Sequence, residues 1–221
     1  MTGVFDIIGP IMVGPSSSHT AGAVNIGRVA RQILNCKPYR VEFTLYGSFA
    51  QTYKGHGTDR ALVAGILGMT TDDPRIKNSL AIAKNEGIYC HFKGSSEPTY
   101  HPNTVRVGLN CINEQFDVVG ISIGGGRIII KEIDKVPVNI TGEYHTLICS
   151  YTERLGMVSK VSSVLAAKNI NIAFMKVSRD EAREKALMVV EVDEPLHDEI
   201  IEIISRLNNI LHVKYIEKIE L

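Results

Sequence analysis

The sequence lacks an excess of charge of either sign. Its 221 residues contain 24 Lys and Arg against 24 Asp and Glu. A chain without a basic field offers no electrostatic attraction to a polyanion, so we expect no nucleic-acid partner. Hydrophobic residues make up 44% and charged residues 22% of the chain, which is typical of a soluble globular protein.

Long apolar runs and a targeting segment are also missing. No stretch approaches the roughly 18–20 apolar residues that cross a bilayer, so we expect no membrane association. Residues 1–11 carry no basic n-region and include Asp6. Because a secretory signal begins with such a region, we expect no signal peptide and a cytoplasmic protein.

Cysteine is scarce and widely spaced. The four cysteines include no Cys-x-x-Cys pair and are Cys36, Cys90, Cys111 and Cys149. Zinc sites and locally bound iron–sulfur clusters usually show closer spacing. We therefore expect four reduced, mostly buried thiols and no metal site in this chain.

Helical periodicity dominates the first ninety residues, and strand patterns follow. Helices are predicted from Ser17 or Ser18 as N-cap to Lys37-Pro38, from Thr58 as cap, and from Asp73-Pro74 to Gly87. Residues 50–57 are interpreted as a polar loop. Strands are predicted over 41–46, 88–92, 104–110, 115–123 and 127–132. This order predicts an α+β domain with helices on a mostly antiparallel sheet.

A polar, proline-containing segment over 133–142 separates this region from the tail. We predict two domains, 1–138 and 143–221, joined there. The tail alternates between the two periodicities, with strands over 144–151, 170–178, 185–192 and 213–219 and helices over 157–168 and 198–207. The order βαββαβ predicts a ferredoxin-like domain.

The tail resembles the ACT family of small-molecule sensing domains through Thr152-Glu153-Arg154-Leu155-Gly156-Met157-Val158 and Asn169-Ile170-Asn171-Ile172, with Leu155 in place of the family's proline. A glycine before a helix lets a ligand approach the free N–H groups, which suit a carboxylate. The resemblance implies an effector site at Gly156, Met157 and Asn171, between paired chains. A purely structural, dimerising module is the alternative, and homodimerisation is expected in either case.

The region before the tail resembles the beta domain of bacterial iron–sulfur L-serine dehydratases. The matching motifs are Phe5-Asp6-Ile7-Ile8-Gly9-Pro10, Val13-Gly14-Pro15-Ser16-Ser17-Ser18-His19-Thr20-Ala21-Gly22, Tyr46-Gly47-Ser48, Lys54-Gly55-His56-Gly57-Thr58-Asp59 and His101-Pro102-Asn103-Thr104. The resemblance implies conversion of L-serine to pyruvate and ammonia, a step of amino-acid degradation and gluconeogenesis. It also implies a 4Fe–4S cluster held by a separate alpha subunit, so that this chain is inactive alone.

The histidines of two motifs are candidates for proton transfer, because imidazole titrates near neutral pH. We expect the helix dipole to lower the pKa of His19, and spacing alone does not assign separate roles to His19 and His56. The expected substrate-binding residues are Ser16, Ser17, Ser18, Thr20, Lys54, Asp59 and Asn103. The serine run at the helix start would hold the substrate carboxylate, and Lys54 would add a positive charge. Asp59 would orient His56 or bind the substrate ammonium.

Each motif also has a structural alternative. The serine run can act only as a helix cap, the Lys54–Asp59 motif only as a tight turn, and the Asn103 motif only as a strand-entry turn. Gly124-Gly125-Gly126 is interpreted as a hairpin rather than a phosphate loop. The first domain also resembles the allosteric substrate-binding domain of some phosphoglycerate dehydrogenases, so a non-catalytic amino-acid-sensing module is the rival function.

Overall fold

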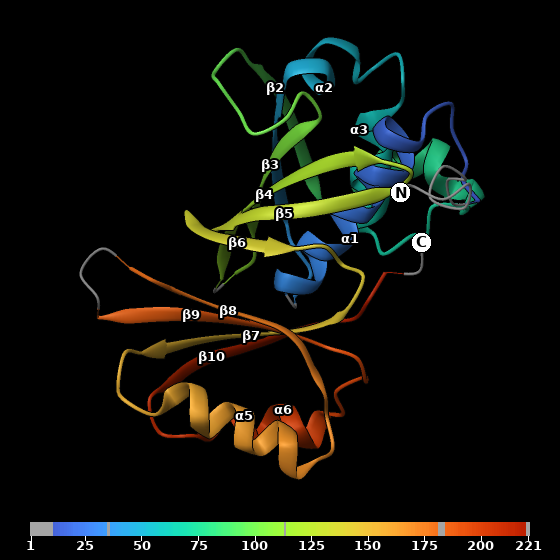
Figure 1. Cartoon of the computed structure of the whole chain (residues 1–221). Helices are drawn as coiled ribbons and strands as arrows, with labels where there is room; N and C mark the ends of the chain where they lie inside the picture. Colours follow the sequence, from blue (N-terminus) through green and yellow to red (C-terminus); the bar gives the residue numbers. More distant parts are fainter. Residues whose placement is uncertain (1–10, 35, 113, 181–183, 220–221) are drawn as a thin grey trace, which may run out of the picture. The chain divides into compact units, whose positions relative to one another are not determined.

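The computed structural model describes residues 11–34, 36–112, 114–180 and 184–219. The chain divides into two compact units, one ending at Lys135 and the other beginning at Val136. Both units combine helices with a sheet, which confirms the predicted α+β class (Figure 1). The predicted linker over 133–142 is wrong in one respect, because it contains strand β6 (Val136–Ile140). Val138 and Ile140 are buried in alternation with the exposed Pro137 and Asn139, and the proline masked this pattern.

The sheet of the first unit has the strand order β2-β1-β3-β4-β5. Its strands are β1 (Arg40–Tyr46), β2 (Tyr89–Ser95), β3 (Thr104–Asn110), β4 (Gln115–Gly124) and β5 (Arg127–Ile133). Only the β1–β2 pair is parallel within it, and the other pairs are antiparallel. The mostly antiparallel sheet is therefore confirmed.

The helices of the first unit follow the predicted order with one addition. They are α1 (Gly22–Leu34), α2 (Gly47–Thr52), α3 (Thr58–Ile66) and α4 (Ser79–Asn85), with a π-helical turn at Ser17–Ala21 and a 3₁₀ helix at Pro74–Asn78. Asp73 caps the 3₁₀ helix as predicted, since its carboxylate accepts from the Arg75 N–H at 2.8 Å. The loop predicted over 50–57 is wrong at its start, where α2 is anchored by the buried Phe49. Six residues are too few for helical periodicity to be recognised.

Two glycines let α1 and α3 pack at backbone contact. A Cβ atom at Gly27 would lie 2.4 Å from the Leu62 carbonyl oxygen, and one at Gly65 would lie 2.1 Å from that of Val24. Any larger residue would push the helices apart. The close crossing places the start of α1, and the π-helical turn with the serine motif before it, beside the loop that leads into α3.

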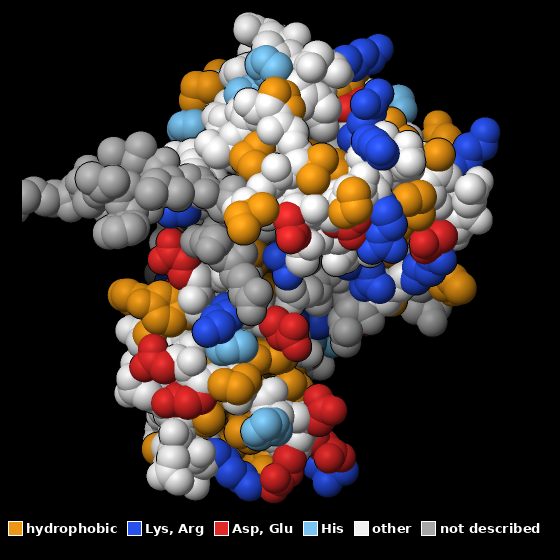
Figure 2. Space-filling model, turned by 90° about the vertical axis from the view of Figure 1, so that its right-hand side faces the viewer, with side chains coloured by type: hydrophobic (Ala, Val, Ile, Leu, Met, Phe, Trp, Pro, Cys, Tyr) orange, Lys and Arg blue, Asp and Glu red, His pale blue; other side chains and the backbone are white. Residues whose placement is uncertain are grey.

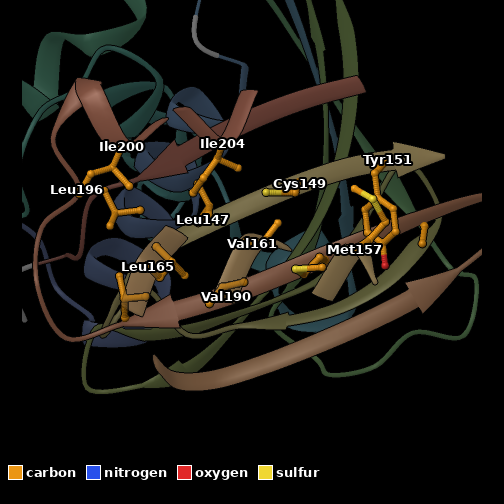
Figure 3. Packing of buried hydrophobic residues seen from close by; sticks show 13 residues of the cluster. Leu147, Cys149, Tyr151, Met157, Val161, Leu165, Val190, Leu196, Ile200 and Ile204 are labelled. Carbon is orange, nitrogen blue, oxygen red and sulfur yellow. The ribbon is translucent and has the colours of Figure 1, made fainter. Parts of the chain in front are cut away.

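The second unit contains the predicted βαββαβ order. Its elements after β6 are β7 (His145–Thr152), α5 (Met157–Ala167), β8 (Ile172–Arg179), β9 (Lys185–Val192), α6 (Asp198–Ser205) and β10 (Ile210–Ile216). The strand order β10-β7-β9-β8 is wholly antiparallel, as in ferredoxin-like folds. Side chains from α5, α6 and one sheet face form a single core, with Val161, Leu165 and Ile204 fully buried (Figure 3).

The prediction of four reduced cysteines is wrong, because Cys36 and Cys111 form a disulfide. Cys36 follows α1 and Cys111 follows β3, 75 residues later. The Tyr39 N–H donates to the Asn110 carbonyl, and this pairing brings the two chain segments together. Sequence spacing could not show this, since the sheet register decides it. Cys90 and Cys149 are free thiols, as expected.

Candidate active site

The serine motif caps a π-helical turn instead of starting an α-helix directly. Ser16 is the N-cap, not Ser17 or Ser18, since its extended backbone precedes the turn and its hydroxyl accepts from the His19 N–H at 3.2 Å. The Gly22 N–H donates to the Ser17 carbonyl, which adds one residue to the turn. Such π turns often occur at functional sites. The extra residue turns His19 inward, where only 9% of it is exposed.

The glycine hairpin between β4 and β5 supports this turn. The Gly125 N–H donates to Ser17 Oγ at 3.3 Å, and Asn25 Nδ2 donates to the Gly126 carbonyl at 3.0 Å. The hairpin interpretation of the three glycines is confirmed, because all three have a positive φ between antiparallel strands. Ser17 is thus already hydrogen-bonded within the fold.

Both ring nitrogens of His19 contact serine hydroxyls. Nδ1 lies 3.0 Å from Ser18 Oγ, and Nε2 lies 2.9 Å from Ser48 Oγ. A neutral imidazole donates through one nitrogen and accepts through the other, so the two serines fix the ring. The sequence places Ser48 in the Tyr46-Gly47-Ser48 motif but does not by itself predict a role for it. The sequence feature that could have indicated this role is Gly47. Its positive φ of 51° lets α2 begin directly after β1, and this turn places Ser48 next to His19.

The two motif histidines are neighbours in space. The His19 and His56 ring centroids are 4.8 Å apart at an interplanar angle of 77°, and Phe49 packs against His19 at 5.2 Å. Burial lowers the pKa of His19, and the nearby His56 lowers it further. The direction agrees with the prediction, but its causes are burial and the neighbouring His56, not the helix dipole on which the prediction is based. Both causes favour the neutral form of the His19 ring, while His56 is exposed at the end of its loop.

We expect the pKa of His19 to rise when His56 is replaced by glutamine. The electrostatic effect of His56 on His19 would be lost, which favours the imidazolium, whereas burial remains and still holds the pKa of His19 below its ordinary value. Titration of the His19 imidazole by NMR measures this directly. His91→Gln, an exposed position in β2, is the matched control and should leave His19 unchanged. An unaltered His19 titration in His56→Gln would contradict the geometry.

A small cavity of about 200 Å³ lies against the His56 loop. It is lined by Val13, Gly14, Pro15, Thr20, Lys54, Gly55, His56, Gly57, Arg60, Ile76 and Lys77. Two predicted binding residues, Thr20 and Lys54, therefore share one cavity with His56. Gly57 rather than Thr58 occupies the N-cap position of α3, because the turn needs its φ of 69°. The carboxylate of Asp59 accepts from the Arg60 N–H at 2.8 Å.

The His101-Pro102-Asn103-Thr104 motif packs against the chain segment that begins with Tyr46-Gly47-Ser48. The Phe49 N–H donates to the Pro102 carbonyl at 3.3 Å, and a Cβ atom at Gly47 would lie 2.7 Å from that oxygen. Asn103 uses its N–H to donate to His101 Nδ1 at 3.1 Å. The motif thus holds the start of α2, and Ser48 with it. The structure places the Asn103 amide group 3.5 Å from the Ser122 carbonyl, whereas its binding role stays a prediction.

The three predicted effector residues do not meet within one chain. Gly156 precedes α5 with a φ of 84°, and Asn171 follows the other end of that helix. Met157 is 1% exposed and belongs to the hydrophobic core. Asn171 Nδ2 donates to Asp193 at 2.6 Å, and its N–H donates to Glu194 at 2.9 Å. The effector site therefore stays a prediction that would need a second chain.

Comparison with known proteins gives a family match for each of the two units. The family described as serine dehydratase beta chain matches residues 3–87, and the ACT domain family matches residues 145–209. The probable L-serine dehydratase beta chain of Bacillus subtilis is 43% identical over 95% of this chain and 96% of its own length. The chain belongs to the serine dehydratase beta-chain family. The L-serine dehydratase beta chain of Peptoniphilus asaccharolyticus is also 43% identical, over 96% of this chain and 97% of its own length.

More distant relatives include a different enzyme. The D-3-phosphoglycerate dehydrogenase of Bacillus subtilis is 27% identical over 88% of this chain but only 37% of its own length. The serine dehydratase beta-chain fold, with its ACT tail, therefore has a counterpart in a part of that longer protein.

The cysteines of this beta-family chain do not fit an iron–sulfur cluster. Cluster ligands are thiolates. Cys36 and Cys111 are joined to each other, and burial raises the pKa of Cys90 to about 11 and that of Cys149 to about 12. In the part of the chain that the structure describes, no group of three His, Cys, Asp or Glu side chains could hold a metal ion. Among the same residues, no helix has the length and apolar character to cross a membrane.

Proposed function

We propose that this chain is the beta subunit of an iron–sulfur-dependent L-serine dehydratase, which converts L-serine to pyruvate and ammonia. In this proposal the chain supplies the proton-transfer and carboxylate-binding half of a shared active site. The observation that carries it is the pair of histidine rings 4.8 Å apart beside a cavity with cationic walls. The 43% identical L-serine dehydratase beta chains support the substrate.

His56 is the proposed base. The reaction begins with removal of the proton from the α-carbon, and the acceptor must reach substrate. His56 is exposed and lines the cavity, whereas His19 is buried and does not line it. His19 is proposed to act beside it as a fixed, neutral neighbour whose ring contact holds the His56 ring in place. Proton transfer by a positioned side chain typically contributes about 10²–10⁴-fold to the rate.

The cavity wall is the proposed site for the substrate carboxylate. Lys54 supplies a positive charge there and Thr20 a hydroxyl, while Ser16, Ser17 and Ser18 hold the turn that carries His19. A carboxylate bound at this wall would present its α-carbon to the exposed His56 ring. Asp59 and Asn103 complete the proposed set, as ammonium and substrate contacts respectively.

The other half of the site is proposed to come from an alpha subunit. The cysteines of this chain do not fit a cluster, so the 4Fe–4S group would lie on that partner together with the groups that act on the β-hydroxyl. This division implies a heteromer in which this chain alone is inactive, and we propose that the heteromer is cytoplasmic.

Pyruvate formation from L-serine, measured without oxygen, tests the shared site. We expect no turnover by this chain alone, none by the alpha partner alone, and full turnover by the two together. Mixing the alpha partner with a chain truncated after residue 142 shows whether the tail is needed for assembly or only for regulation. Full serine deamination by this chain by itself would refute the shared active site.

An amino-acid-sensing module without catalysis is the second candidate. The similarity to D-3-phosphoglycerate dehydrogenases over most of this chain favours it. Calorimetric titration with L-serine separates the two, because a sensor binds L-serine tightly without a partner. A catalytic half-site binds it weakly until the partner is present.

A further inference from the structure

The cavity beside His56 has more positive charge than one amino-acid carboxylate needs. Lys54, Arg60 and Lys77 all line it, and none of the described residues that line it is Asp or Glu. These three cations form no salt bridge with any acidic residue in the described parts of the chain. Figure 2 shows Lys and Arg side chains gathered on the upper part of the face that it presents.

A buried hydroxyl faces the same cavity without a partner. Thr20 is 2% exposed, and its Oγ1 has no hydrogen bond within the described structure. Leaving a buried hydroxyl unpaired is unfavourable, so a ligand that accepts its hydrogen bond would be stabilising. Gly14 lies directly against this hydroxyl, because a Cβ atom there would lie 2.6 Å from Thr20 Oγ1, so a larger residue at position 14 would displace the Thr20 side chain.

L-serine, whose carboxylate is proposed to bind at this wall, would compensate only part of the positive charge of the cavity. It is a zwitterion, and one carboxylate would leave the three cations largely uncompensated while its ammonium group lay close to them. A tetrahedral dianion matches better, because its several oxygens can contact separate Lys and Arg side chains and the threonine hydroxyl at once. The cations come from three separate elements, the His56 loop, α3 and the 3₁₀ helix, and so surround the cavity from different sides.

We propose that this cavity binds a phosphate group, as inorganic phosphate or as a phosphate monoester, through Lys54, Arg60, Lys77 and Thr20. Binding of the phosphate does not depend on the proposed serine dehydratase activity. A second consequence does rest on that function: phosphate competes with the carboxylate of L-serine for Lys54 and Thr20, and so raises the KM of the enzyme.

Titration of the full chain with inorganic phosphate at constant ionic strength tests the binding. We expect saturable binding, weakened roughly tenfold by Arg60→Gln and by Lys77→Gln because each removes one charge-assisted contact. Lys84→Gln, an exposed position in α4 outside the cavity, is the matched control and should bind as the unaltered chain does. Thr20→Val should weaken binding without changing the charge.

Each outcome bears on the proposal. O-phospho-L-serine that binds more tightly than inorganic phosphate identifies a monoester as the ligand, whereas equal affinities identify the free ion. Absence of saturable binding overturns the proposal, as does binding that Arg60→Gln and Lys77→Gln leave unchanged. Weakening by Lys84→Gln to the same extent would show only general attraction to positive charge.

Competition in the assembled enzyme separates this site from the proposed activity. We expect inorganic phosphate to raise the KM for L-serine without lowering kcat, and Lys77→Gln to reduce this inhibition. Phosphate binding by a complex that does not deaminate L-serine would refute the proposed function and leave the phosphate site intact. Turnover that is insensitive to phosphate, despite phosphate binding, would refute the competition.

Discussion

Replacing His56 by alanine is expected to lower kcat for L-serine by about 10²–10⁴-fold in the complex with the alpha partner, because the side chain proposed to accept the α-proton is lost. The side chain is exposed, so its removal leaves the core of the first unit unchanged. His19→Ala is expected to lower kcat in the same direction, since the ring that contacts His56 disappears. Initial rates of pyruvate formation over a range of L-serine concentrations measure both.

Three comparisons make this result specific. His91→Ala removes an exposed imidazole from β2 and should leave turnover unchanged. Ser48→Ala removes only the hydrogen bond at Nε2 of His19. It should lower kcat roughly tenfold, in line with one lost hydrogen bond. Normal turnover in both His19→Ala and His56→Ala complexes would show that neither histidine transfers the proton.

Loss of the Cys36–Cys111 bond is expected to lower the free energy of unfolding by about 4.5 kcal/mol, the chain-entropy value for a closed loop of this length. The 75-residue separation makes the effect large, because an unfolded chain without the cross-link gains much more conformational freedom. The bond ties the end of α1 to the end of β3, so the helix that follows the serine motif is stabilised with the sheet. Urea unfolding of the chain with and without reductant measures the difference.

The cysteine variants check the cause. Cys36→Ser with Cys111→Ser should match the reduced chain and no longer respond to reductant. Cys90→Ser removes a free thiol and should retain the full response to reductant. Equal stability of oxidised and reduced chains would contradict a stabilising disulfide.

Local sequence was sufficient for most elements of the fold. The tail's βαββαβ order is recognisable because its helices and strands differ in the spacing of their apolar residues, and the predicted bounds of β9 agree with the structure. Short elements escaped prediction: α2 has too few residues for a helical pattern, and the proline in β6 hid an alternating one. The motifs identified His19 and His56 without any structure, because loops that combine glycine, serine and histidine suit proton transfer near a carboxylate.

Tertiary structure alone decided how these residues act together. Ser48 reaches His19 Nε2 only because Gly47 turns the chain directly after β1, and Arg60 and Lys77 join Lys54 only because α3 and the 3₁₀ helix pack around one cavity. The disulfide depends on the register between the start of β1 and the end of β3. Sequence by itself determined the family motifs and the order of elements, since these depend on neighbouring residues. Contacts between residues far apart in the chain depend on packing and register, so only the folded structure determined them.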